Sequence, residues 1–191
     1  FEESPYPTLK HSTYFNVYDE LFAQYRGRPI TFVEVGLLDG GSLFMWRSFF
    51  GPKARIIGVD LNPECLKWES EGFDIFIGDQ GDPEFWREFR EQVGPVDILL
   101  DDGGHSYEEQ IATVEGIAEV VLDGGMVVVE DTHTSYMTGF GDEQASFINF
   151  VKRLLDGINS RFGQFSCEIA SEPFWSIEVF ESIVALKVNR S

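Results

Sequence analysis

The chain has 191 residues, of which 33 are acidic and 14 are lysine or arginine, giving a formal net charge of -19 at pH 7. Such an excess of negative charge repels nucleic acid phosphates and anionic membrane surfaces, so we expect no nucleic acid and no membrane as partner. A hydrophobic content of 43% supplies a substantial core. We therefore expect a single domain over residues 1–191.

The cysteines and the apolar runs bear on location. Cys65 and Cys167 have no metal-ligand spacing between them, which favours a reduced intracellular setting. No apolar run approaches the roughly 20 residues of a membrane helix, and the chain does not begin like a secretion signal. We expect a cytoplasmic protein, whose oligomeric state, a homo-oligomer included, the sequence leaves open.

Strand-like and helix-like segments alternate along most of the chain. Apolar runs typical of strands cover residues 30–35, 55–60, 73–77, 96–100, 126–130, 176–180 and 183–188. Segments typical of helices cover residues 13–24, 42–50, 83–93, 107–121 and 143–162. This alternation predicts an α/β fold with a mostly parallel sheet covered by helices on both faces, and the last two strands predict an antiparallel hairpin at its edge.

Acidic side chains recur where the predicted strands end. They are Glu34, Asp60, Asp79, the pair Asp101 and Asp102, and the pair Glu130 and Asp131. Because an open α/β sheet binds its ligand outside the carboxyl ends of its strands, we expect these acids to line a site.

The segment from Glu34 to Ser42 is rich in glycine and joins the first strand to a helix. Glycine lets such a turn approach a ligand closely, and the following helix offers free N–H groups. The wide spacing of Gly36 and Gly40 resembles the first motif of class I methyltransferases that use S-adenosylmethionine. Asp60, about 20 residues further on, is where an acid that binds ribose hydroxyls is expected.

The cofactor-side residues also have plain structural interpretations. Asp79 and Gln80 would lie by the adenine, but glycine turns occur without cofactors, and Asp60 with Asn62 could simply cap a helix. The residues predicted to bind the cofactor are Glu34, Gly36, Gly40, Ser42, Asp60, Asp79, Gln80 and Asp101.

A metal and a base are predicted at the two acidic strand ends. Acids crowded together repel one another unless a cation or a shared proton separates them, so Asp102, Glu130 and Asp131 are candidate ligands for Mg²⁺, with Mn²⁺ or Ca²⁺ as substitutes. His105 would then remove a proton from a bound hydroxyl. A turn rich in Asp and Gly, a helix cap and a structural histidine are the alternatives, and His133 is expected only to support the site.

Six segments together resemble a known family: Lys10–Phe15, the glycine loop through Trp46, Gly58–Asp60, Gly78–Gln80, Asp101–His105 and Glu130–Thr132. The family is that of the Mg²⁺-dependent sugar O-methyltransferases of the macrolide and rhamnosyl type, grouped with the so-called cephalosporin hydroxylase family and with short methyltransferases of polysaccharide precursors.

The resemblance implies a Rossmann-like class I methyltransferase fold with a seven-stranded sheet, S-adenosylmethionine as methyl donor, and a carbohydrate or glycoside substrate. It also implies a metal at Asp102, Glu130 and Asp131, with His105 as the catalytic base. Gly104 stands where the family commonly has serine. The macrolide enzymes can carry a further amino-terminal domain, so their particular substrates do not transfer to this chain.

Two other functions fit parts of the pattern. A catechol-type O-methyltransferase needs the same cation but a flat apolar pocket, and a non-catalytic cofactor-binding protein needs the glycine loop alone. An iron oxygenase is disfavoured because it needs a second histidine beside His105, and the sequence places none convincingly.

Overall fold

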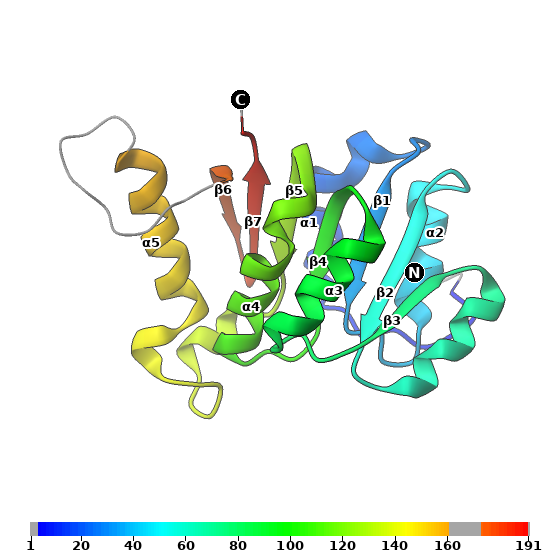
Figure 1. Ribbon diagram of the computed structural model, residues 1–191, viewed down its shortest axis with the longest axis horizontal. Helices are drawn as coiled ribbons and strands as arrows, with labels where there is room; N and C mark the ends of the chain where they lie inside the picture. The colour runs from blue at the N-terminus through cyan, green and yellow to red at the C-terminus, as the bar shows by residue number, and fades with distance from the viewer. Residues whose placement is uncertain (1–3, 161–172, 191) are drawn as a thin grey trace.

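A computed structural model describes residues 4–160 and 173–190. Within them, seven strands form one sheet in the order β3-β2-β1-β4-β5-β7-β6 (Figure 1). β1 to β5 are parallel, whereas β7 runs antiparallel to both β5 and β6. The strands are β1 Thr31–Val35, β2 Arg55–Asp60, β3 Asp74–Ile77, β4 Val96–Asp101, β5 Val121–Val129, β6 Phe174–Phe180 and β7 Ile183–Val188. The predicted fold class is confirmed.

Helices cover both faces of the sheet, as Figure 1 shows. α1 and α2 lie on one face, and α3, α4 and α5 lie on the other. Their bounds are α1 Tyr14–Phe22, α2 Gly41–Phe50, α3 Pro83–Val93, α4 Tyr107–Ile117 and α5 Phe147–Ser160. Short 3-10 helices span Ala23–Tyr25, Pro63–Glu71, Ala118–Val120, Thr132–Tyr136 and Glu143–Ala145. Cys167 and residues 161–162 of the predicted last helix lie outside the described residues.

Two apolar clusters form the core, one on each face of the sheet. In β4, Ile98 and Leu100 belong to the cluster under α1 and α2, while Leu99 between them belongs to the cluster under α3 to α5. Successive side chains of a strand point to opposite faces, so a strand buried on both faces must be apolar throughout. The burial of both faces leaves the ends of the strands as the place for polar side chains.

The helix that follows His105 begins at a capping box. The Ser106 side chain accepts a hydrogen bond from the Glu109 backbone N–H, and the Glu109 carboxylate accepts one from the Ser106 N–H. These two bonds satisfy N–H groups that the first turn would otherwise leave free. The start of α4 therefore fixes the backbone next to His105.

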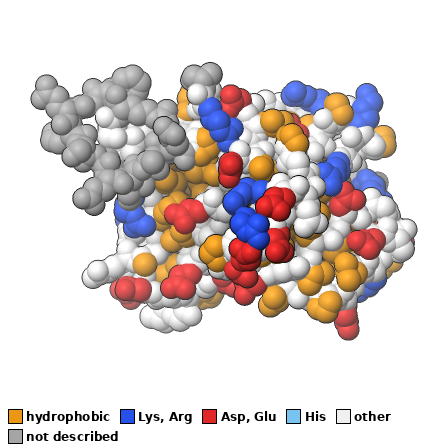
Figure 2. Space-filling model, viewed as in Figure 1, with side chains coloured by type: hydrophobic (Ala, Val, Ile, Leu, Met, Phe, Trp, Pro, Cys, Tyr) orange, Lys and Arg blue, Asp and Glu red, His pale blue; other side chains and the backbone are white. Residues whose placement is uncertain are grey.

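Figure 2 shows acidic and basic side chains interleaved on the face that carries α3 and α4. Arg87 pairs with glutamates on its own helix, and Arg90 pairs with Glu119. Exposed pairs of this kind contribute little to stability, which makes this face an ordinary solvated surface. None of the helices in the described ranges combines the length and apolar character that crossing a membrane requires.

Three predicted boundaries were wrong by several residues. The helix predicted over 107–121 ends at Ile117, and the helix predicted from Glu143 begins at Phe147. β5 begins at Val121, five residues before the predicted start at Met126. The residues between, Leu122 to Gly125, read as a turn because Asp and two glycines favour one. The strand tolerates them at an irregularity in the pairing of β4 with β5, where Gly124 has a φ of +83°.

Candidate active site

The register of the sheet brings the acidic strand ends to one edge. Val35 of β1 pairs with Val59 of β2 and with Asp101 of β4, and Asp101 pairs in turn with Val129 of β5. A cleft of about 640 Å³ opens at this edge. Its lining includes the predicted residues Gly36, Ser42, Asp60, Asp79, Gln80, Asp102, His105 and Asp131. Four other predicted site residues do not line the cleft: Glu34, Gly40, Asp101 and Glu130.

Gly36 allows the ends of β1 and β4 to touch. It has a φ of +87°, and a Cβ atom there would lie 2.1 Å from the Asp102 carbonyl oxygen. The Asp102 N–H donates to the Val35 carbonyl oxygen at 2.9 Å. The glycine therefore serves strand packing as well as the shape of the cleft.

The Asp60 carboxylate links the loop after β1 to the loop after β2. One carboxylate oxygen accepts a hydrogen bond from the Leu37 N–H and the other accepts one from the Asn62 N–H, each at 2.8 Å. The Cys65 side chain also hydrogen-bonds to Asp60. A carboxylate offers about four acceptor positions, so one remains for a ligand in the cleft. Asp79 is exposed and accepts a hydrogen bond from the Gly81 N–H.

Gln80 and Asp101 hold the loop that carries Asp102 and His105. The Gln80 amide nitrogen donates to the Asp101 carboxylate at 3.1 Å, and its oxygen accepts from the Gly104 N–H at 2.7 Å. The Gly103 N–H also donates to Asp101. Burial raises the pKa of Asp101 to about 7. Asp101 thus lies behind the cleft, where it shapes the loop.

Glu34 is also internal. Its carboxylate is fully buried and accepts hydrogen bonds from the Ser42 hydroxyl at 2.7 Å and from the Trp46 indole N–H at 3.0 Å. Burial raises the pKa of Glu34. These bonds tie the end of β1 to α2, and the glycine loop spans the distance between them.

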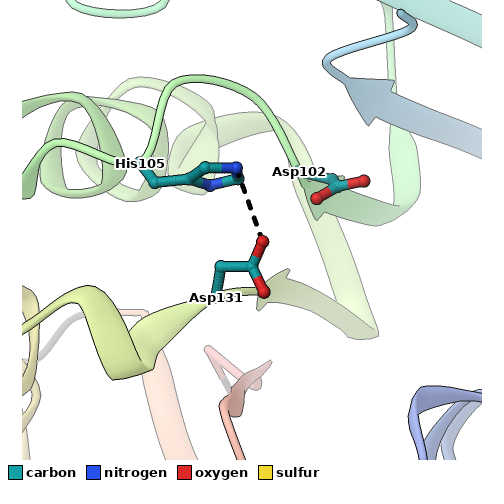
Figure 3. A group of neighbouring side chains, drawn as sticks. All are labelled: Asp102, His105 and Asp131. Carbon is teal, nitrogen blue, oxygen red and sulfur yellow. Dashed lines mark ion pairs between the residues drawn. The ribbon is translucent and has the colours of Figure 1, made fainter. Parts of the chain in front are cut away.

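Asp102, His105 and Asp131 come together at the cleft (Figure 3). One ligand atom from each lies within 4.8 Å of the others, and His105 Nε2 is 3.4 Å from Asp131 Oδ2. Asp131 has a φ of +54°, and the Tyr14 hydroxyl donates to its other oxygen. This trio combines hard oxygen ligands with an imidazole beside a carboxylate, which suits both cation binding and proton transfer.

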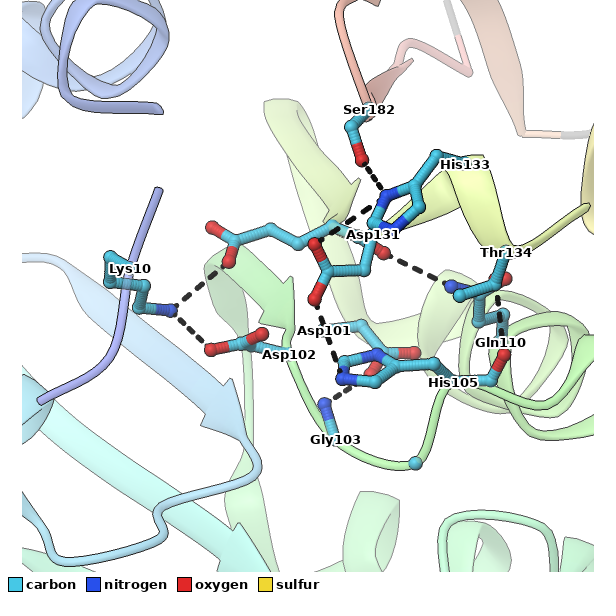
Figure 4. A network of polar contacts seen from close by, with 12 residues as sticks. Lys10, Asp101, Asp102, Gly103, His105, Gln110, Asp131, His133, Thr134 and Ser182 are labelled. Carbon is cyan, nitrogen blue, oxygen red and sulfur yellow. Dashed lines mark hydrogen bonds and ion pairs between the residues drawn. The ribbon is translucent and has the colours of Figure 1, made fainter. Parts of the chain in front are cut away.

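Glu130 points elsewhere, toward a cation that the sequence argument overlooked. Lys10 Nζ lies 2.6 Å from Asp102 (Figure 4), and it also lies 3.1 Å from Glu130 and 3.3 Å from Glu34. The Tyr18 hydroxyl donates to the second oxygen of Glu130. The structure therefore brings Asp102 and Asp131 together with His105, and it places Glu130 with Lys10.

Burial shifts the pKa values of this ion cluster. It raises the pKa of Glu130, although the charge of Lys10 opposes the shift. Burial also lowers the pKa of Lys10, but the three carboxylates around it outweigh that effect and keep the ammonium protonated. Lys10 lay within a segment of the family resemblance, and the surplus of acids at the strand ends was the signal that some cation had to balance them.

All three histidines of the chain lie near Asp131. His133 Nδ1 is 2.6 Å from the Ser182 hydroxyl and 3.9 Å from Asp131, and the ring centroids of His11 and His133 are 6.4 Å apart. The Tyr14 hydroxyl also lies 2.9 Å from Ser182. Ser182, in the turn between β6 and β7, thus positions Tyr14 and His133, which both contact Asp131.

Comparison with known proteins gives sequence relatives. The 8-demethyl-8-alpha-L-rhamnosyl tetracenomycin-C 2'-O-methyltransferase of Streptomyces olivaceus is 33% identical over 77% of this chain and 41% of its own length. The mycinamicin VI 2''-O-methyltransferase of Micromonospora griseorubida is 31% identical over 82% of this chain and 40% of its own length. The chain thus spans about 40% of these relatives. No protein-family model matches it.

A solved structure agrees with these relatives. The methyltransferase MycE of the mycinamycin biosynthetic pathway, in complex with Mg, SAH and mycinamycin VI, superposes with a TM-score of 0.85 and 28% identity. The match covers 96% of this chain and 51% of MycE. By sequence and by fold, the chain is therefore a homologue of the sugar O-methyltransferases of macrolide and tetracenomycin pathways, and it has the class I methyltransferase fold.

Proposed function

We propose that residues 1–191 form one methyltransferase domain that transfers a methyl group from S-adenosylmethionine to a hydroxyl of a sugar or glycoside. The observation that carries the proposal is the trio of Asp102, His105 and Asp131 at the cleft that the glycine loop and Asp60 line. The relatives, which are named as sugar O-methyltransferases, support it.

The donor would occupy the cleft. Asp60 would bind the ribose hydroxyls through its remaining acceptor position, and the backbone at Gly36 would face the methionine part. Ser42 lines the same wall, while Asp79 and Gln80 would lie by the adenine. The donor would not contact Glu34, Gly40 or Asp101 directly. These residues would instead fix the conformation of the loops that the donor contacts.

We further propose a Mg²⁺ ion held by Asp102, Glu130 and Asp131. Carboxylate oxygens are the ligands that this ion prefers, and two of the three already lie within 4.8 Å of one another. We keep Glu130 as a ligand because the Lys10 ammonium contacts the carboxylates of both Glu130 and Asp102. A single cation can therefore lie between these two carboxylates. When bound, the ion would lower the pKa of a sugar hydroxyl.

His105 would accept the proton of that hydroxyl. Asp131, 3.4 Å from its Nε2, would orient the ring and stabilise the imidazolium that results. The sugar oxygen then attacks the sulfonium methyl, the carbon–sulfur bond breaks and the electron pair stays on sulfur. The chain's contribution is to place the two reactants in line.

The cellular setting belongs to the same proposal. We place the enzyme in the cytoplasm, because Cys65 is a free, buried thiol. The net charge of -19 favours an uncharged glycoside over a polyanion as substrate.

A methylation assay tests the proposal. Purified protein is incubated with the methyl donor, Mg²⁺ and a panel of rhamnosides, macrolide glycosides and catechols, with and without EDTA. We expect methylation of a glycoside that EDTA abolishes and added Mg²⁺ restores. His105→Ala should lower kcat by roughly 10²- to 10⁴-fold, as expected for loss of a general base. His133→Ala, a histidine outside the trio, should lower it far less.

Each other outcome has a definite meaning. Methylation that EDTA leaves unchanged removes the metal from the reaction. Methylation of catechols alone favours the catechol-type enzyme, and tight donor binding without turnover favours the non-catalytic binding protein.

A further inference from the structure

Lys10 is a buried cation among three acids. Its side chain is 2% exposed, and its ammonium lies within 3.3 Å of Glu34, Asp102 and Glu130. It comes from a segment before α1 that has no regular secondary structure, residues 7–11. Figure 4 shows Lys10 reaching Asp102 from the side away from His105. The positive charge of Lys10 is thus supplied by a segment that is not part of the sheet.

Local contacts hold residues 4–10 against the start of α2. The Ser4 hydroxyl donates to the Gly41 carbonyl oxygen at 2.9 Å, and the ring of Tyr6 lies 4.5 Å from that of Trp68. A Cβ atom on Gly41 would lie 2.3 Å from the Pro7 carbonyl oxygen. The segment, which also lines the cleft with Thr8, Leu9 and Lys10, is therefore a closely fitted wall of the cleft.

Asp102 belongs to two groups at once. Its Oδ2 atom lies 2.6 Å from the Lys10 ammonium, and its carboxylate is part of the trio with His105 and Asp131. A divalent ion at Asp102 would come within a few ångströms of the ammonium. Like charges at that separation repel strongly where water is excluded, so both cations cannot hold Asp102 at full strength.

We propose that Lys10 is a tethered counter-ion that shares Asp102 and Glu130 with the divalent cation, so that the ammonium and the metal compete for the same carboxylates. Metal binding then weakens the ion pairs of Lys10 with Asp102 and Glu130 and makes residues 4–10 more mobile. Loss of the metal restores these ion pairs and fixes residues 4–10 against the cleft. Lys10 thereby lowers the metal affinity of the site and links the metal to one wall of the cleft. This inference rests on the Mg²⁺ site of the proposed function.

Calorimetric titration with Mg²⁺ tests the competition. Lys10→Met keeps the length of the side chain and removes its charge, Lys10→Arg keeps the charge, and Lys53→Met removes a charge from an exposed lysine elsewhere. At constant ionic strength we expect Lys10→Met to bind Mg²⁺ about tenfold or more tightly than the unaltered protein. Lys53→Met and Lys10→Arg should stay within about threefold of it.

Hydrogen exchange on the unaltered protein gives a second measurement that needs no variant. Saturating Mg²⁺ should speed exchange at the Tyr14 amide, which donates to the His11 carbonyl oxygen where the segment joins α1, with α3 as an internal reference that does not change. If Lys10→Met fails to fold without metal, this experiment decides alone, and exchange that Mg²⁺ leaves unchanged or slows overturns the inference.

The outcomes separate this inference from the proposed function. Unaltered protein that binds Mg²⁺ while Lys10→Met binds it equally or more weakly overturns the inference and leaves the metal site standing. Binding by Lys10→Met alone supports it, and binding by neither protein overturns both.

Discussion

Asp101 and Asp102 are neighbours in the chain, yet their carboxylates meet different surroundings. Asp101 is the last residue of β4 and turns inward to Gln80 and Gly103, whereas Asp102 turns to the cleft and to Lys10. Because side chains alternate along a strand, two adjacent acids at its end must face opposite ways. One acid then shapes the loop, and the other is available to a ligand.

Asp101 makes the stability of the protein depend on pH. Burial raises its pKa to about 7 from an ordinary value of 3.8, so the folded protein binds this proton more tightly than the unfolded chain does. Its contribution to the free energy of unfolding is therefore fully present below about pH 4 and is lost as the pH rises toward 7. Relative to Asp101→Asn, the unaltered protein should lose about 2 to 4 kcal/mol between pH 4 and pH 8.

Urea denaturation of both proteins at several pH values, with EDTA present, measures this difference. The asparagine has no titrating group, and it can still accept a hydrogen bond from Gln80 or Gly103. A stability difference that stays constant over this pH range would show that Asp101 does not carry the proton.

The sequence predicted the acids of the site better than it predicted their partners. The position of Asp102 and Asp131 follows from strand ends, which the apolar runs before them make recognisable. The contact between Glu130 and Lys10 joins residues 120 positions apart in the chain, and residues 7–11, which carry Lys10, have no period at all. No local pattern encodes such a contact, so the sequence indicated a metal, and not a lysine, as the balancing charge.

At the scale of elements, the site depends on how closely β1 and β4 end beside each other. Gly36 and Gly94 both have positive φ, +87° and +77°, but only Gly36 has a neighbour where a Cβ atom would go. Gly36→Ala should lower the free energy of unfolding by about 3 kcal/mol or more, because the Asp102 backbone must move. Gly94, with a ψ of -161°, lies in a region that is essentially restricted to glycine, so Gly94→Ala should cost the backbone strain alone, about 1 to 3 kcal/mol.

Thermal and chemical denaturation of the two variants check this comparison, and binding of the methyl donor gives a second readout. Gly36→Ala should weaken donor binding, whereas Gly94→Ala, at the far end of α3, should not. Equal losses of stability in the two variants would mean that the strand ends adjust without cost.

Elements with a strong local signal were predicted well, and those set by tertiary contacts were not. The predicted bounds of β2, β7 and α3 agree with the structure, since apolar runs or a Pro after a capping Asp mark them. The 3-10 helix Pro63–Glu71 was predicted only as an alternative, a helix capped by Asp60 and Asn62, and the Asn62 side chain does accept a hydrogen bond from the Glu64 N–H. It has weak periodicity and is fixed by the packing of Trp68 on the glycine loop, where Gly40 leaves room for the indole ring.

At the scale of the whole molecule, folding concentrates a net charge of -19 in a compact volume. The charges repel one another more in the folded state than in the expanded chain, and salt screens this repulsion. Raising NaCl from about 10 mM to about 100 mM shortens the screening length from about 30 Å to about 10 Å. The melting temperature should therefore rise by roughly 2 to 4 °C, which is about 1 kcal/mol for a chain of this size.

Calorimetry at pH 7 with EDTA, in NaCl and in KCl, measures this effect without any bound divalent ion. Salt also weakens favourable ion pairs, but those of Arg26, Arg55 and Arg87 are exposed and contribute little, so the net change should stay positive. The buried pairs of Lys10 are shielded from solvent ions, and Lys10→Met should show the same salt slope as the unaltered protein. A melting temperature that falls with added salt would mean that attractive pairs outweigh the self-repulsion of the acids.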